Sequence, residues 1–171
     1  MFEGWGEFFL LAGSAAAVLI GLIFVVVTLM QDRPRSAVLE GSKLYMGPVV
    51  LDVSIVLVLS AAALVPGIGA REFALVAAAS ALWGLWRGLQ SLRGIGKLGE
   101  AVHWTDFWFY GAAPTALFLL LGAVAWSFWS GHGWAKDGLA AAITGLLLLA
   151  VRNEWDLVTW LAPRGEDGEP S

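Results

Sequence analysis

The sequence predicts an all-α protein, a polytopic transmembrane helical bundle of about five spans. Composition is the first observation, since 58% of the 171 residues are hydrophobic and only 14% are charged, with a mean hydropathy of +0.75. Long runs without charge are the second, and turn or stop signals between those runs are the third. This balance excludes an ordinary soluble domain, which is more charged, and a disordered chain, which is poor in apolar residues.

The first span is expected at residues 8–30, a run that contains no charged side chain. A bilayer core of about 30 Å needs about 20 apolar residues in a helix. Residues 31–35 then combine proline with two arginines, which stops the helix and its burial. Acidic Glu3 and Glu7 in front of the run, and the length of the run, distinguish it from a cleaved signal peptide.

Four further spans are predicted, at 46–65, 73–92, 108–129 and 139–161. The last is apolar only as far as Val151, too short to span, so its continuation to Leu161 should belong to the same helix, which Pro163 ends. A re-entrant segment is the alternative for this region. We therefore expect one transmembrane domain, residues 1–162, and a short acidic cytoplasmic tail, residues 163–171.

Orientation follows from the lysines and arginines of short loops, which stay on the cytoplasmic side. One side of the predicted bundle carries Arg33, Arg35, Lys43, Arg93, Lys97 and Arg164, and the other carries Arg71 and Lys136. This asymmetry predicts an outside N-terminus and an inside C-terminus, as an odd number of spans requires. Of the ten tryptophans, only Trp83 and Trp86 fall clearly within the predicted hydrocarbon core.

Small residues at four-residue spacing mark two expected packing faces. They are Gly13, Ala17 and Gly21 in the first span, and Ser80, Gly84 and Gly88 in the third. In lipid, helices associate through close backbone approach at such residues. We expect these faces to pack within the chain; self-association through the first span is the alternative.

Residues 8–25, FFLLAGSAAAVLIGLIFV, resemble the first span of a group of small, uncharacterised bacterial multi-pass inner-membrane proteins. The resemblance covers one span. It implies a protein of the bacterial inner, or cytoplasmic, membrane and implies no particular activity.

Charged residues at membrane depth are costly and are therefore candidates for function. The predicted topology places five of them in one layer near the cytoplasmic interface: Asp52, Arg87, Arg152, Glu154 and Asp156. Arg152 and Asp156 are four apart and can pair within one helix. We expect Arg87 to pair with Glu154 or Asp52. The layer is interpreted as structural ion pairs that set helix register, with a gate, ion site or proton relay, and a docking surface, as alternatives.

The segment that ends the third span carries Arg93 and Lys97 among leucines and glycines. Cations at the membrane surface attract anionic lipid headgroups. The functional interpretation is an anionic-lipid site, and the alternative is simple retention of positive charge on the inner side.

The sequence lacks the residues of the common catalytic sites. It has no cysteine, so thiolate chemistry and disulfides are excluded. Its two histidines, His103 and His132, are expected on opposite sides of the membrane and therefore cannot share a metal. Its glycine pairs lack the lysine and hydroxyl of a phosphate-binding loop. A net charge of −4 does not favour nucleic acid as a partner. We therefore expect no enzyme, no metal and no cofactor.

These observations predict a non-catalytic integral membrane protein that acts as a subunit or assembly protein through helix packing and the charged layer. Its expected partners are the bilayer and further copies of itself or a larger membrane complex. The alternative is a small homo-oligomeric channel or transporter that uses Asp52, Arg87 and Glu154.

Overall fold

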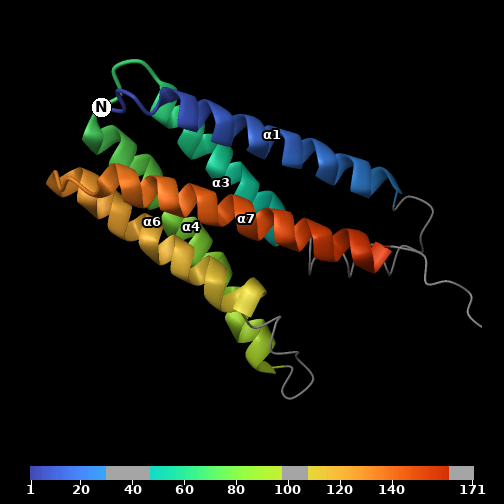
Figure 1. The fold of residues 1–171 in the computed structure, drawn as a ribbon. Coiled ribbons are helices and arrows are strands. Elements are labelled where there is room, and N and C mark those ends of the chain that lie inside the picture. Colours follow the sequence, from blue (N-terminus) through green and yellow to red (C-terminus); the bar gives the residue numbers. More distant parts are fainter. Residues whose placement is uncertain (30–46, 98–107, 162–171) are drawn as a thin grey trace, which may run out of the picture.

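The structure, a computed structural model, describes residues 1–29, 47–97 and 108–161. Within these ranges all regular secondary structure is helical, with five α-helices, one π-helical turn and no strand (Figure 1). The elements are α1 (Gly6–Leu29), α3 (Gly47–Leu64), α4 (Ala70–Lys97), η3 (Trp108–Ala112), α6 (Ala113–Ser130) and α7 (Ala135–Leu161). The all-α prediction is confirmed for the described residues.

Each predicted helix is present, and two of them are longer than expected. Helix α4 continues to Lys97, so Arg93 and Lys97 lie in its last turns and not in a loop, where the sequence analysis placed them. Nothing in these turns stops a helix, because Gly94 and Gly96 merely weaken one. Helix α7 begins at Ala135 and runs without interruption to Leu161, as one continuous helix.

The fourth predicted helix is interrupted near its start. Residues Trp108–Ala112 form a π-helical turn that leads directly into α6. Pro114 lies in the first turn of α6, and it has no N–H to donate to the preceding turn. The Thr115 Oγ1 hydroxyl donates to the Gly111 carbonyl at 2.7 Å, which satisfies one acceptor of the irregular turn.

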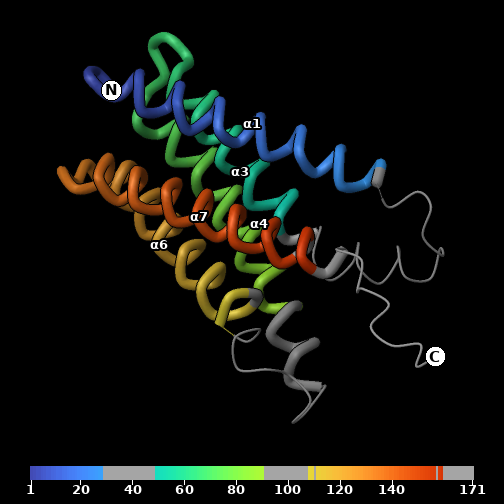
Figure 2. The backbone as a smooth tube through the Cα atoms, turned by 45° about the vertical axis from the view of Figure 1, so that its right-hand side comes forward, coloured from blue at the N-terminus to red at the C-terminus, as the bar shows by residue number. Residues whose placement is uncertain are grey.

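Successive helices run in opposite directions (Figures 1 and 2). One end of the bundle, here the first end, holds the N-terminus, the α3–α4 turn and the α6–α7 turn. The other, the second end, holds the last turns of α1, α4 and α7 and the first turns of α3 and η3. Glycines close both turns at the first end: Gly67 and Gly131 have φ of 75° and 78°, and the Gly131 N–H caps α6 by donating to the Ser127 carbonyl.

The helices pack mainly as two pairs, α1 with α3 and α4 with α6, and α7 lies against α3 and α6. At the first end an aromatic cluster, Phe2, Phe9, Phe73 and Phe128, joins α1, α4 and α6. The ring centroids of Phe2 are 4.9 Å from those of Phe9 and Phe73, and Phe73 is 5.1 Å from Phe128. All of these contacts are edge-to-face, the geometry that aromatic pairs prefer.

Among the described residues, two helices are long and apolar enough to cross a membrane, over 6–28 and 113–130, and 49–64 is a shorter apolar stretch. Buried helices of soluble proteins and N-terminal signal sequences meet the same criterion of length and composition. The number of spans and their orientation stay predictions.

Candidate functional site

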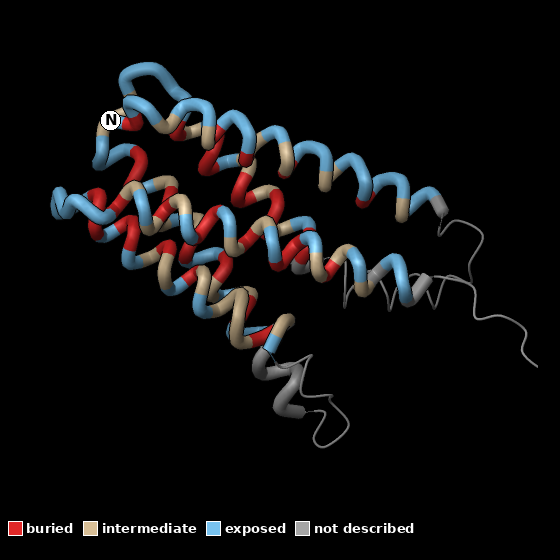
Figure 3. Tube along the Cα trace, in the orientation of Figure 1, coloured by how far each residue is buried: buried red, intermediate tan, exposed pale blue. Residues whose placement is uncertain are grey.

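Polar and apolar side chains are distributed across the bundle in an unusual way. Among the residues whose burial is described, the buried polar ones are Asp52, Ser60, Ser127 and Asn153. Large apolar side chains are exposed on the outside of every α-helix, and examples are Leu10, Phe24, Val58, Leu82, Leu119, Trp126, Leu148 and Trp155. Figure 3 shows the corresponding pattern, with exposed segments on the outer sides of the tubes and buried ones facing inward. Several polar groups are thus more enclosed than much of the apolar surface.

Asp52 lies on α3, five residues after Gly47, and is only 2% exposed. Its Oδ2 atom has no hydrogen-bond partner among the described residues. The buried neighbours of Asp52 on the same helix are apolar, including Val49, Val53 and Val56. A buried polar atom without a partner is rare in proteins and requires an explanation.

Arg87, on α4, is half-buried and acts electrostatically on Asp52 from the neighbouring helix. No ion pair within 4.0 Å joins Arg87 to Asp52 or Glu154 in the described part of the chain, where Arg152 and Asp156 are the pair that forms. Arg87 therefore acts on Asp52, one of the two acids expected to pair with it, but without a direct ion-pair contact in this structure. Sequence spacing could not settle this, because the three residues lie on different helices.

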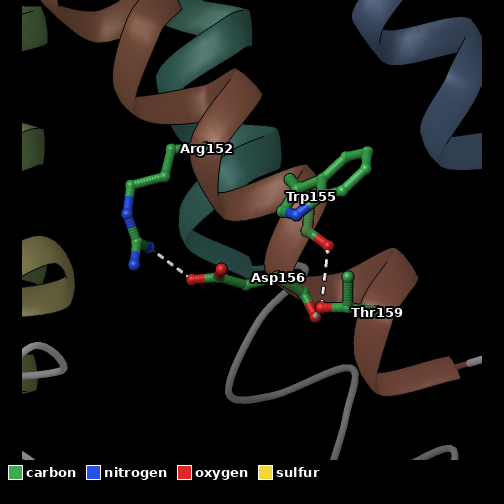
Figure 4. Close-up of polar contacts among 4 residues, drawn as sticks. All are labelled: Arg152, Trp155, Asp156 and Thr159. Carbon is green, nitrogen blue, oxygen red and sulfur yellow. Dashed lines mark hydrogen bonds and ion pairs between the residues drawn. The ribbon is translucent and has the colours of Figure 1, made fainter.

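Arg152 joins α7 to the π-helical turn. Its guanidinium pairs with the Asp156 carboxylate one turn along the helix, as the four-residue spacing predicted (Figure 4). The guanidinium carbon also lies 3.7 Å from the centroid of the Phe109 ring of η3, a cation–π contact. Below the pair, the Thr159 hydroxyl donates to the carbonyls of Trp155 and Asp156 at 3.1 and 3.0 Å. These contacts indicate a structural role for Arg152.

Two side chains between Arg152 and Asp156 carry buried oxygens without partners. Asn153 is 1% exposed, and its Oδ1 has no hydrogen-bond partner in the described chain. The Oε1 atom of Glu154 is also buried and also lacks a hydrogen-bond partner there. The sequence analysis singled out Glu154 but not Asn153. The sequence could have marked Asn153 as a candidate, because it is a polar residue within a largely apolar helix. Its burial could not be predicted, because the direction of its side chain depends on how α7 packs.

The small-residue face of α4 lies against α6. A Cβ added at Gly84 would overlap the Phe118 ring, and one at Gly88 would lie 2.8 Å from Thr115 Oγ1. Ser80 is half-buried on the same helix. Close approach of the two helices therefore requires glycine at Gly84 and Gly88.

The small-residue face of α1 meets its neighbour at one position. A Cβ at Gly13 would lie 3.2 Å from Ser60 Cβ of α3, but nothing lies within 4 Å of such an atom at Gly21, and Ala17 is exposed. Helix α1 instead buries Phe9, Ala12 and Ala16. Packing within the chain at Ala17 and Gly21 is therefore not observed, because the buried face of α1 is rotated away from this stripe.

No family model matches this chain, and neither does any curated protein or solved structure.

Other positions from the sequence analysis add little to the site. His132 lies in the exposed α6–α7 turn, where its Nδ1 is 2.6 Å from Ser130 Oγ, while His103 lies outside the described residues. The side chains of Arg93 and Lys97 also lie outside the described part, so the anionic-lipid interpretation stays a prediction. Within the described residues, no three histidine, aspartate or glutamate side chains are grouped to hold a metal ion.

Proposed function

We propose that this protein is a five-span integral protein of the bacterial inner membrane, with its N-terminus outside. The observation that carries the proposal is the apolar exterior around a partly polar interior. Leu148, in the middle of α7, is 67% exposed, whereas Asn153 of the same helix is 1% exposed. Apolar surface of this kind is unfavourable in water but is well solvated by lipid tails. Lipid tails cannot form hydrogen bonds, so polar groups are favoured inside the bundle and not on its lipid-facing surface.

A non-catalytic role as a subunit or assembly protein fits the accessible surface best. The enclosure of Asp52 keeps it from reaching another protein, and Arg152 already has Asp156 and Phe109 as partners. A partner in the membrane would therefore contact apolar helix surface. Anionic lipid at the second end remains part of this proposal through Arg93 and Lys97.

Cysteine accessibility tests the membrane proposal directly, because the native chain contains no cysteine. Three single variants are informative: Leu148→Cys at the centre of α7, Gly133→Cys in the α6–α7 turn and Ser171→Cys in the tail. A membrane-impermeant maleimide should label Gly133→Cys in intact cells, Ser171→Cys only after the membrane is opened, and Leu148→Cys in neither case. Labelling of Leu148→Cys in intact membranes would contradict the proposal, since a 67% exposed side chain in water reacts readily.

Native mass spectrometry of the gently extracted protein tests the role. A subunit or assembly protein should co-purify with a larger, unrelated chain in fixed proportion. A discrete homo-oligomer without other chains would contradict the subunit role and favour the second candidate.

The second candidate is a small homo-oligomeric channel or transporter, and the unpartnered Asp52 and Asn153 oxygens favour it. Polar groups that face a bundle interior are typical of pathways through membranes. Ion flux into liposomes should then be lost in Asp52→Asn and retained in Asp156→Asn. Equal flux in wild type and Asp52→Asn would exclude a pathway that depends on Asp52.

A further inference from the structure

The strongest unassigned feature is the enclosed Asp52 side chain. An ionised carboxylate removed from water needs hydrogen bonds or a contacting cation in exchange. Asp52 is 2% exposed, its Oδ2 accepts no hydrogen bond from the described residues, and Arg87 is not within ion-pair distance. Among the described side chains, the Oδ2 atom of Asp52 therefore has neither the hydrogen bond nor the contacting cation that an ionised carboxylate requires.

The charged groups around Asp52 can be named helix by helix. Helix α4 contributes Arg87, and α7 contributes Arg152, Glu154 and Asp156 at the same end of the bundle. The charged residue of α1 is Glu7, at the first end. Among the described side chains, Arg152 is paired with Asp156, which leaves Arg87 as the cation that acts on the Asp52 carboxylate.

The number of oxygen atoms decides which ligand the site can hold. A metal cation takes several oxygen ligands, typically six to eight for calcium, and the described side chains offer no cluster of three or more acids or histidines. A proton requires one carboxylate oxygen. We propose that Asp52 is a proton-binding site inside the bundle, occupied when the helices pack as in this structure.

Proton binding there has a mechanical consequence. When the carboxylic acid releases its proton to water, the remaining carboxylate is attracted to the Arg87 guanidinium on α4. The protonation state of Asp52 thereby sets the attraction between α3 and α4. This goes beyond the proposed role, since it holds for an assembly subunit and for a pore alike.

Infrared spectroscopy of the full chain in lipid nanodiscs tests the inference. At neutral pH the wild type should show the C=O stretching band of a protonated carboxylic acid, shifted in D2O. The part of the band that is lost in Asp52→Asn should remain in Glu154→Gln, the matched control from the same end of the bundle. Absence of the band in wild type, or an unchanged band in Asp52→Asn, would overturn the proposal.

Isotope labelling keeps the test valid where Asp52→Asn does not fold. Aspartate labelled with ¹³C at the side-chain carboxyl should displace the Asp52 part of the band in the unmodified protein, and labelled glutamate should leave that part in place. Displacement by glutamate alone would assign the proton to a glutamate and overturn the inference. Neither result depends on cysteine labelling, so failure of the proton site and failure of the membrane proposal are distinguishable.

Discussion

The two ends of the bundle are stabilised by different kinds of contact. At the first end, Phe2, Phe9, Phe73 and Phe128 form edge-to-face pairs that join three helices. Near the second end, Asp52 and Asn153 are equally enclosed but have oxygens without hydrogen-bond partners in the described chain. Ring packing at the first end therefore stabilises the fold. The unpartnered buried oxygens near the second end lower the free energy of unfolding. Such local losses are characteristic of functional regions in proteins.

The largest expected effect concerns the aromatic cluster. Phe73→Ala removes a fully buried ring that contacts Phe2 and Phe128, and should reduce the free energy of unfolding by about 3–5 kcal/mol. Denaturant unfolding in mild detergent, followed by circular dichroism, measures this. Trp83→Ala is the control, because Trp83 is 57% exposed, and a comparable loss there would show that the first end has no special role.

The next effect distinguishes the two small-residue faces. Gly84→Ala places a Cβ in the Phe118 ring and should cost about 1–3 kcal/mol of stability. Gly21→Ala meets open space, so it should be neutral or stabilising by about 0.5–1 kcal/mol, the ordinary helix preference for alanine. The same unfolding assay compares them. Equal destabilisation by both changes would mean that α1 also packs closely through Gly21, against another chain.

At the second end, a substitution of a buried residue should raise the free energy of unfolding and not lower it. Asp52→Val replaces an unpartnered buried carboxyl by an apolar side chain of similar size, and should raise the free energy of unfolding by about 1–2 kcal/mol. Thermal unfolding in nanodiscs checks this against wild type. A marked loss of stability would instead show that the carboxyl has a hydrogen-bond partner essential to the fold.

The smallest expected effect belongs to Arg152. A double-mutant cycle with Arg152→Gln and Phe109→Leu should give a coupling energy of about 0.5–1 kcal/mol for the cation–π contact. A parallel cycle of Arg152→Gln with Asp156→Asn should give about 0.3–0.5 kcal/mol, typical of a partly exposed pair one turn apart. A zero coupling in the first cycle would mean that Phe109 does not hold Arg152.

The sequence alone predicted the helical class and the approximate position of each helix in the described part of the chain. Charge-free runs, prolines and glycines act through neighbouring residues, so they can be recognised without a structure. The pair of Arg152 with Asp156 was predictable for the same reason, because a four-residue spacing is local to one helix. The π-helical turn before Pro114 and the extension of α4 to Lys97 were not predicted, since helix ends depend on small energy differences.

Tertiary structure decided which face of each helix is buried. The stripes at Gly84 and Gly21 look alike in sequence, yet one lies against Phe118 and the other against nothing within 4 Å. The enclosure of Asp52 and Asn153, and the separation of Arg87 from both acids expected to pair with it, were decided in the same way. The physical reason is that helix rotation is set by contacts with segments far away in the chain, and helical periodicity alone contains no information about them.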